Sequence, residues 1–162
     1  MTIDKVIKKV YKVLDTVTPL KTDCGSLCEA ECCKGDNTTG MILFPGESEF
    51  YKDNKNFKII NDTNNNSVLI CSGKCNRSER PIACRIFPLF PVIVDDRLYV
   101  IDDPRASGVC PLLYDEIKLD KKFEKAVYKT GKLLLKNEST SDFLYSLTDE
   151  ISEIISLREK LF

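Results

Sequence analysis

The sequence predicts an α+β fold, with short antiparallel strands between an N-terminal helix and a helical C-terminal segment. Three observations predict it. Residues 3–14 carry apolar side chains at helical spacing. The middle of the chain holds short runs rich in β-branched and aromatic residues, separated by turn-forming residues. Residues 116–162 return to helical periodicity.

The N-terminal helix is predicted because its apolar residues repeat three and four positions apart, which places them on one face. Thr2 is a suitable N-cap residue because its hydroxyl can accept a hydrogen bond from the first turn. The apolar face consists of Ile3, Val6, Ile7, Val10, Val13 and Leu14.

The predicted strands form hairpins. An Asn-rich turn at residues 61–66 separates two of them, and residues 95–97 form a second turn. A further short strand is expected at residues 41–44, and Pro45-Gly46-Glu47 then begins a turn or a short helix. The paired strands are residues 57–60 with 67–70, and 91–94 with 98–101.

The C-terminal segment, residues 116–162, contains no cysteine. Its apolar residues predict two amphipathic helices that pack on a cysteine-bearing core at about residues 20–115. The chain has 162 residues with no internal repeat and no low-complexity linker, so one domain, 1–162, is the simplest organisation.

Composition excludes several classes of function. The 24 basic and 25 acidic residues nearly balance, so no basic excess points to a nucleic-acid partner. The chain has no histidine, which excludes Ser-His-Asp and Cys-His catalysis and zinc sites that depend on histidine.

Targeting signals are also missing from the sequence given. Charged residues interrupt the first fifteen positions, so they do not form the apolar region of a signal peptide. The longest apolar run, residues 86–94, contains two prolines and falls far short of the roughly 20 residues of a membrane-spanning helix. We therefore expect a cytoplasmic protein with no membrane partner, whose thiols stay reduced.

Eight cysteines in a reducing compartment indicate metal binding rather than disulfides. Thiolates are soft ligands that select zinc, copper(I) or iron–sulfur clusters. We expect an iron–sulfur cluster or Zn(II), as two four-cysteine zinc sites, as one or two clusters, or as a mixture. The protein is thus predicted to be a small metal-centred domain, with metal ions as partners and its protein partner unknown. The expected ligands are Cys24, Cys28, Cys32, Cys33, Cys71, Cys75, Cys84 and Cys110.

The first four cysteines cannot all face one ion from a regular helix. Cys24, Cys28 and Cys32 would share a stripe, whereas Cys33 would point away from it. Either the segment is irregular or Cys33 serves a second site. In the second cluster, Gly73 permits the tight turn that Cys71 and Cys75 need to reach the same metal.

Two arginines flank Cys84 and are candidates for offsetting the negative charge of the thiolates. Pro81 favours an extended backbone for Arg80. If that backbone continues through Cys84, alternate side chains point in opposite directions. Arg80 would then share the side of Cys84 and Arg85 would not, so Arg80 is expected to contribute more, although both are predicted to bind the cofactor.

Five motifs stand out in the middle of the chain: the vicinal pair Cys32-Cys33, the segment Leu43–Glu47, Cys71 with Cys75, the segment Arg80–Pro88, and Cys110-Pro111-Leu112. Together they resemble the YkgJ-type cysteine-cluster family, described as a zinc- or iron-chelating domain. The resemblance covers about residues 24–113. It implies eight cysteine ligands with bound zinc or iron–sulfur, and it implies no particular reaction.

Three functional hypotheses follow. The first is an iron–sulfur protein with redox or accessory enzymatic work. The second is a structural zinc domain that serves as an interaction or chelating module without catalysis. The third is an enzyme whose site lies outside the cysteines, with unknown catalytic residues. Glu47 bears on the third: as an acid in the first turn of a helix it is stabilised by the helix dipole, and the alternative is a ligand or catalytic role.

Overall fold

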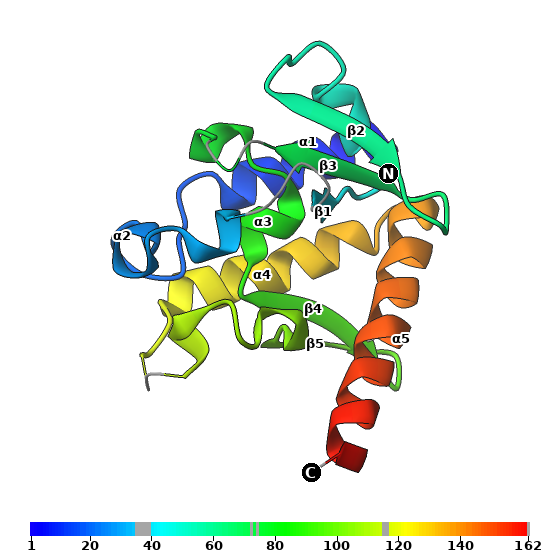
Figure 1. Ribbon diagram of the computed structural model, residues 1–162. Helices are drawn as coiled ribbons and strands as arrows, with labels where there is room; N and C mark the ends of the chain where they lie inside the picture. Colours follow the sequence, from blue (N-terminus) through cyan, green and yellow to red (C-terminus); the bar gives the residue numbers. More distant parts are fainter. Residues whose placement is uncertain (35–39, 72, 74, 115–116, 162) are drawn as a thin grey trace.

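The computed structural model describes residues 1–34, 40–71, 73, 75–114 and 117–161. It has the predicted α+β architecture, with helices at both ends and two small antiparallel sheets (Figure 1). None of the described helices is both long enough and apolar enough to cross a membrane.

Three long helices form the helical part of the fold. The N-terminal helix α1 (Ile3–Leu14) confirms the predicted boundaries, and it packs against α4 (Lys121–Leu134). Helix α4 begins where the Asp120 side chain accepts a hydrogen bond from the main-chain N–H of Lys122, an N-cap. Helix α5 (Glu138–Leu161) follows after a short turn, so both predicted C-terminal helices are present.

The strands pair as two separate sheets. The first has the order β1-β3-β2. In the second, Asp95 and Asp96 both adopt positive φ, which suits a tight two-residue hairpin turn. All pairs are antiparallel, which confirms both predicted hairpins. The strands are β1 (Gly40–Ile42), β2 (Phe57–Asn61), β3 (Ser67–Cys71), β4 (Leu89–Val94) and β5 (Arg97–Asp102).

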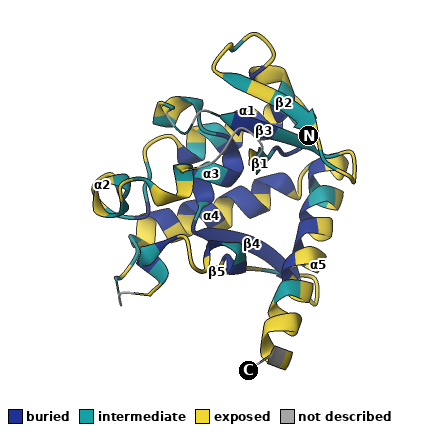
Figure 2. Cartoon of the chain, in the orientation of Figure 1, coloured by how far each residue is buried: buried dark blue, intermediate teal, exposed yellow. Residues whose placement is uncertain are grey.

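The main apolar core surrounds α4, which packs against α1 on one side and against strand β4 and α5 on the other. In Figure 1, α4 crosses between the three-stranded sheet and the β4–β5 hairpin, and α5 runs down one side. A Cβ on Gly131 would lie 2.8 Å from a Leu98 methyl carbon, so this glycine lets α4 approach the hairpin closely. The last turns of α5 extend beyond this core and are exposed (Figure 2).

Cys28 and Cys84 lie on short helices, whereas Cys71 ends strand β3. Helix α2 (Gly25–Cys28) has one turn, and α3 (Ile82–Ile86) has slightly more. The prediction of an extended backbone through Cys84 is wrong, because the chain is extended only as far as Pro81 and then becomes helical. The proline supplies a carbonyl that accepts a hydrogen bond from the Arg85 N–H, which closes the first turn.

Candidate functional site

Cysteines from four segments of the chain gather beside Arg80 and Cys84, around two neighbouring cavities. The larger cavity has a volume of about 100 Å³ and the smaller about 30 Å³. Cys32, Arg80 and Cys84 line both. The larger cavity is also lined by Cys33, Cys71 and Cys75, and the smaller by Cys24, Cys28 and Cys110.

The first cysteine segment is irregular, as one of the two alternatives predicted. After α2, Glu29 and Ala30 both adopt left-handed backbone conformations, and a 3-10 helix, Glu31–Cys33, follows. Because of this break, the neighbouring residues Cys32 and Cys33 do not share the same surroundings: Cys32 lines both cavities, and Cys33 lines only the larger one. The Cys32 thiol donates a hydrogen bond to the Cys33 sulfur, which lowers the pKa of Cys33.

Gly73 lies between the next two cysteines and approaches the first segment. Its φ is +79°, in the left-handed region that favours glycine. A Cβ on this residue would lie 2.6 Å from the carbonyl oxygen of Cys33. Glycine is therefore required both by the backbone conformation and by the close approach of two cysteine-bearing loops; residues 72 and 74 lie outside the described part of the chain.

Cys84 lies among other sulfurs, whereas Cys110 lies among apolar side chains. Burial raises the pKa of Cys84, the neighbouring sulfurs of Cys33, Cys75 and Cys71 raise it further, and Arg80 opposes the rise. Cys110 is buried beside Ala106 and Leu112 in a small apolar cluster, and burial raises its pKa too.

The two arginines that flank Cys84 lie on opposite sides of their segment. Arg80 lies among the cysteines: burial raises the pKa of Cys75, and a hydrogen bond from Arg80 opposes this. The Arg85 guanidinium is turned away. It donates to the carbonyl oxygens of Arg80 and Ser78, both at 2.7 Å, and stacks on the Tyr11 ring 4.6 Å from its centroid.

Two guanidinium groups beside the sulfur-lined cavities keep an unused donor. The Nε atoms of Arg77 and Arg80 are buried and find no hydrogen-bond partner within the described part of the chain. Buried N–H groups almost always have partners in folded proteins. Since both arginines line the smaller cavity, a negatively charged species there would supply the missing acceptors.

All eight cysteines are free thiols, and Cys32 is the most exposed of them. Within the described residues, no three Cys, Asp or Glu side chains are spaced as they would be around a metal ion. The structure thus brings the predicted ligands into one region without closing them into a coordination sphere.

Glu47 is a buried carboxylate, which the sequence did not indicate. It begins a 3-10 helix, Glu47–Phe50, but its side chain is 0% exposed and interacts elsewhere. Its oxygens accept hydrogen bonds from the Tyr11 hydroxyl at 2.6 Å and from the main-chain N–H groups of Ile82 and Phe44 at 2.9 and 2.7 Å. Burial, opposed by these donors, raises the pKa of Glu47 to about 7.

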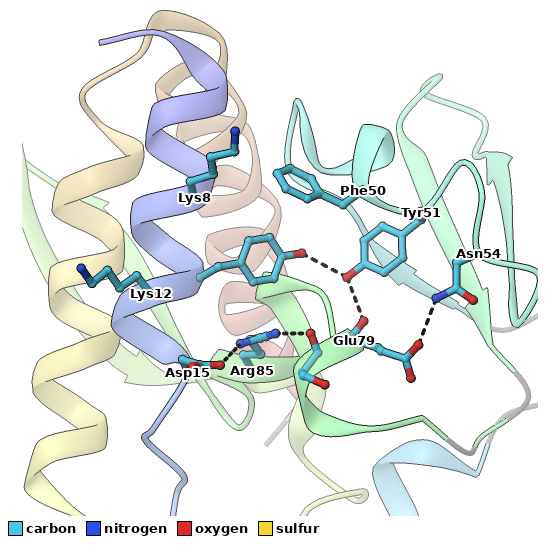
Figure 3. Close-up of a pocket in the computed structure, with 10 residues that line it drawn as sticks. Lys8, Lys12, Asp15, Phe50, Tyr51, Asn54, Glu79 and Arg85 are labelled. Atoms are coloured by element: carbon cyan, nitrogen blue, oxygen red, sulfur yellow. Dashed lines mark hydrogen bonds and ion pairs between the residues drawn. The ribbon is translucent and has the colours of Figure 1, made fainter.

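A pocket of about 500 Å³ lies against Tyr11, on the Arg85 side of the segment that carries Cys84 (Figure 3). Sequence reasoning missed it. One signal was present: three residues of α1 and the residue that caps its end line the pocket at a helical spacing of three, four and seven positions, which places them on one face. They are Lys8, Tyr11, Lys12 and Asp15.

Comparison of the chain with family models, with curated proteins and with solved structures found no match.

Proposed function

We propose that this protein binds metal through its cysteine thiolates, as an iron–sulfur cluster or as Zn(II). The observation that carries the proposal is the convergence of eight free thiols from distant segments beside buried arginine N–H groups that lack acceptors. A thiolate-ligated metal is negatively charged, because four thiolates on a divalent ion leave two negative charges. The Nε–H groups of Arg77 and Arg80 would donate hydrogen bonds to this negatively charged centre.

The cavities divide six of the cysteines into two groups of three, and Cys32 and Cys84 line both cavities. Cys33, Cys71 and Cys75 belong to the larger cavity, with Cys84, whose pKa responds to all three of them. Cys24, Cys28 and Cys110 belong to the smaller, and Cys32, which lines both cavities, is a fourth thiol within its reach. Four sulfurs suit one zinc ion or one cluster. Metal binding would require the sulfur atoms of each group to lie closer together than they do in this structure.

A structural role for the metal is supported by the shortness of the local elements. The helices between Cys24 and Cys33 have four and three residues, and α3 has five. Helices this short are unstable on their own, so they depend on other contacts. A metal would supply such contacts, because the free energy of binding thiolates becomes folding free energy. A structural zinc module without catalytic activity is therefore the second candidate.

The resemblance to the YkgJ-type family and the cytoplasmic location belong to the same proposal. A reducing compartment would keep the eight thiols available as ligands. The family resemblance points to the same cysteines as ligands and adds no reaction to them.

The experiment is anaerobic purification followed by elemental analysis for iron, zinc and acid-labile sulfide. Iron with sulfide and broad visible absorbance identifies a cluster, and zinc without colour identifies zinc sites. Cys75→Ser and Cys28→Ser should each reduce the metal bound per chain, since they alter different groups. A wild-type chain without metal, with all eight thiols reactive, would contradict the proposal.

A further inference from the structure

The β4–β5 hairpin forms a sheet of its own, and its two outer edges differ. On the β4 side, the main-chain N–H of Ile93 donates a hydrogen bond to the Thr148 hydroxyl of α5 at 3.3 Å. Helix α5 thus covers this edge (Figure 1). No strand of the described chain pairs with the outer edge of β5. Strand β5 is therefore free to pair with another chain.

The register shows which backbone groups of β5 point outward. A two-residue turn makes Val94 and Arg97 a hydrogen-bonded pair, and such pairs alternate along antiparallel strands. The bond from the Asp103 N–H to the Pro88 carbonyl oxygen, at 2.8 Å, follows the same alternation. The residues between these pairs direct their N–H and C=O groups away from β4, and those groups form no main-chain hydrogen bond with any described residue. These residues are Leu98, Val100 and Asp102.

Strand β5 also lacks the features that keep other strands away from a free edge. Proteins commonly protect such edges with charged side chains, prolines or very short strands. The free edges of the other sheet have this protection, because β1 has three residues and β2 carries Lys58. The four central residues of β5, Leu-Tyr-Val-Ile, include no charge, proline or glycine, and Tyr99 is 46% exposed. We therefore expect this edge to be covered in solution.

A groove of about 370 Å³ lies beside the same edge, between β5 and α4. Its apolar lining comes from the first half of β5 and from Tyr128 of α4, which is 40% exposed. Its charged lining residues are one acid, Glu124, and one base, Lys125. The groove could thus receive side chains of an added strand, and it has no net charge that would repel a second copy of the chain.

The sequence of β5 is complementary to itself when two copies run antiparallel. Only residues that both direct their backbone groups outward can form hydrogen-bonded pairs across the new edge. With Val100 of one copy opposite Val100 of the other, Tyr99 lies opposite Ile101 and Leu98 opposite Asp102. Aromatic and β-branched residues paired in this way stabilise antiparallel sheets.

Charge favours this register over its neighbours. It brings Arg97 beside Asp102 of the second copy, and neither residue forms an ion pair with any described residue. A shift by two residues in one direction would place Asp96 opposite Asp102, which are like charges. The opposite shift would place Tyr99 opposite the acid Asp103. Of these three registers, only the one centred on Val100 places opposite charges together.

We infer that two copies of this chain associate through β5, so that their hairpins form one four-stranded antiparallel sheet with Val100 at its two-fold axis. The interface goes beyond metal binding and does not depend on it, because β5 contains no cysteine.

The first test is sedimentation equilibrium of the purified protein, which should show a dimer. Val100→Pro removes the central N–H donor of each copy, and it should raise the dissociation constant at least about tenfold because two hydrogen bonds are lost. The hairpin itself should remain, since this N–H does not bond to β4 and Pro91 already occupies the position opposite. Val100→Thr is the matched control. It keeps the N–H and the branched side chain, so its dissociation constant should stay near that of the wild type.

Hydrogen exchange of the wild-type protein tests the same interface without a variant, and therefore applies even if Val100→Pro does not fold. The amide protons of Leu98, Val100 and Asp102 should exchange more slowly as the protein concentration rises. That of Tyr99, which bonds to Val92 within the hairpin, is the internal control. A monomer at millimolar concentration would overturn the inference. A dimer in which the three outward amides exchange as in the monomer would also overturn it, because its interface would lie elsewhere. Protection that appears only when a foreign peptide is added would show a different occupant and would overturn it too.

Discussion

The Arg85 side chain donates a hydrogen bond of 2.7 Å to the main-chain carbonyl oxygen of Arg80, while the Arg80 guanidinium faces the cysteines. The side chains of the two arginines thus lie on opposite sides of the same backbone segment. On one side are the sulfur-lined cavities, and on the other is the pocket beside Tyr11. Substituting each arginine should therefore affect a different property.

Arg80→Met should lower metal affinity by about 10–100-fold, the usual effect of removing a residue that hydrogen-bonds to the metal ligands. Arg85→Met should leave metal affinity nearly unchanged and lower the free energy of unfolding by about 2 kcal/mol or more, because the carbonyl oxygens of Arg80 and Ser78 lose their donor. Chelator competition and urea unfolding measure the two effects. Equal losses of affinity in both variants would show that Arg80 has no special position at the sulfurs.

Gly73→Ala should reduce metal content and destabilise the protein. The added Cβ would meet the Cys33 carbonyl oxygen and would push apart the two loops that carry the cysteines of the larger cavity. Gly108→Ala is the matched control, because Gly108 has a similar φ of +84° with nothing within 4 Å of the added Cβ. Gly108→Ala should retain full metal content and should lower the free energy of unfolding only by the cost of backbone strain, of order 1 kcal/mol. The same metal content in both variants would mean that this approach of the loops does not matter for binding.

Glu47 should make the protein less stable as the pH rises from about 4.5 to about 7. Its pKa is about 7 in the folded state against 4.5 ordinarily, so the folded state holds the proton over a range in which the unfolded chain has lost it. The cost at neutral pH is roughly 3 kcal/mol, since each pKa unit corresponds to 1.36 kcal/mol. The titratable and charged groups around this carboxyl are Tyr11 from α1, Arg85 from α3, and Tyr51.

Urea unfolding of Glu47→Gln at pH 5 and pH 7.5 measures this effect, because glutamine does not titrate. The fall in stability seen for the wild type should shrink in this variant. Glu49→Gln is the control, from an exposed glutamate of the same 3-10 helix, and should retain the wild-type dependence. If the pH dependence of all three proteins were the same, Glu47 would not titrate in this range.

Removal of metal by a chelator under reducing conditions should unfold the cysteine-bearing part of the chain. The expected ligands run from Cys24 to Cys110 and hold together short elements that are unstable alone. Thermal unfolding followed by circular dichroism should show a lower melting temperature after chelation. An unchanged melting temperature in a protein shown to be metal-free would contradict a structural role for the metal.

The long elements could be predicted from the sequence because each carries its own pattern. Residues 3–14 have helical periodicity, and that periodicity arises from packing on one face, so the boundaries agree with α1. The β4–β5 hairpin was equally clear, since its turn residues separate two apolar runs. Helix α3 was missed because five residues are too few to show a period, and Pro81 suits an extended chain as well as a helix start.

The surroundings of the candidate site were predictable only in part. The sequence marked the cysteines and showed that Cys33 could not share a helical stripe with Cys24, but not which sulfurs would share a cavity. That depends on the left-handed residues Glu29 and Ala30, neither of which is a glycine that would signal them. The burial of Glu47 was equally hidden, because its partner Tyr11 lies 36 positions away in the chain.

X-ray absorption spectroscopy at the edge of the bound metal identifies the atoms that contact it, and therefore measures directly whether the cysteine sulfurs are its ligands. We expect a first coordination shell of sulfur, at about 2.3 Å if the metal is zinc. Cys75→Ser and Cys28→Ser should each reduce the signal of that shell per chain. A first shell made mainly of oxygen or nitrogen atoms, unchanged in both variants, would contradict the assignment of the cysteines as metal ligands.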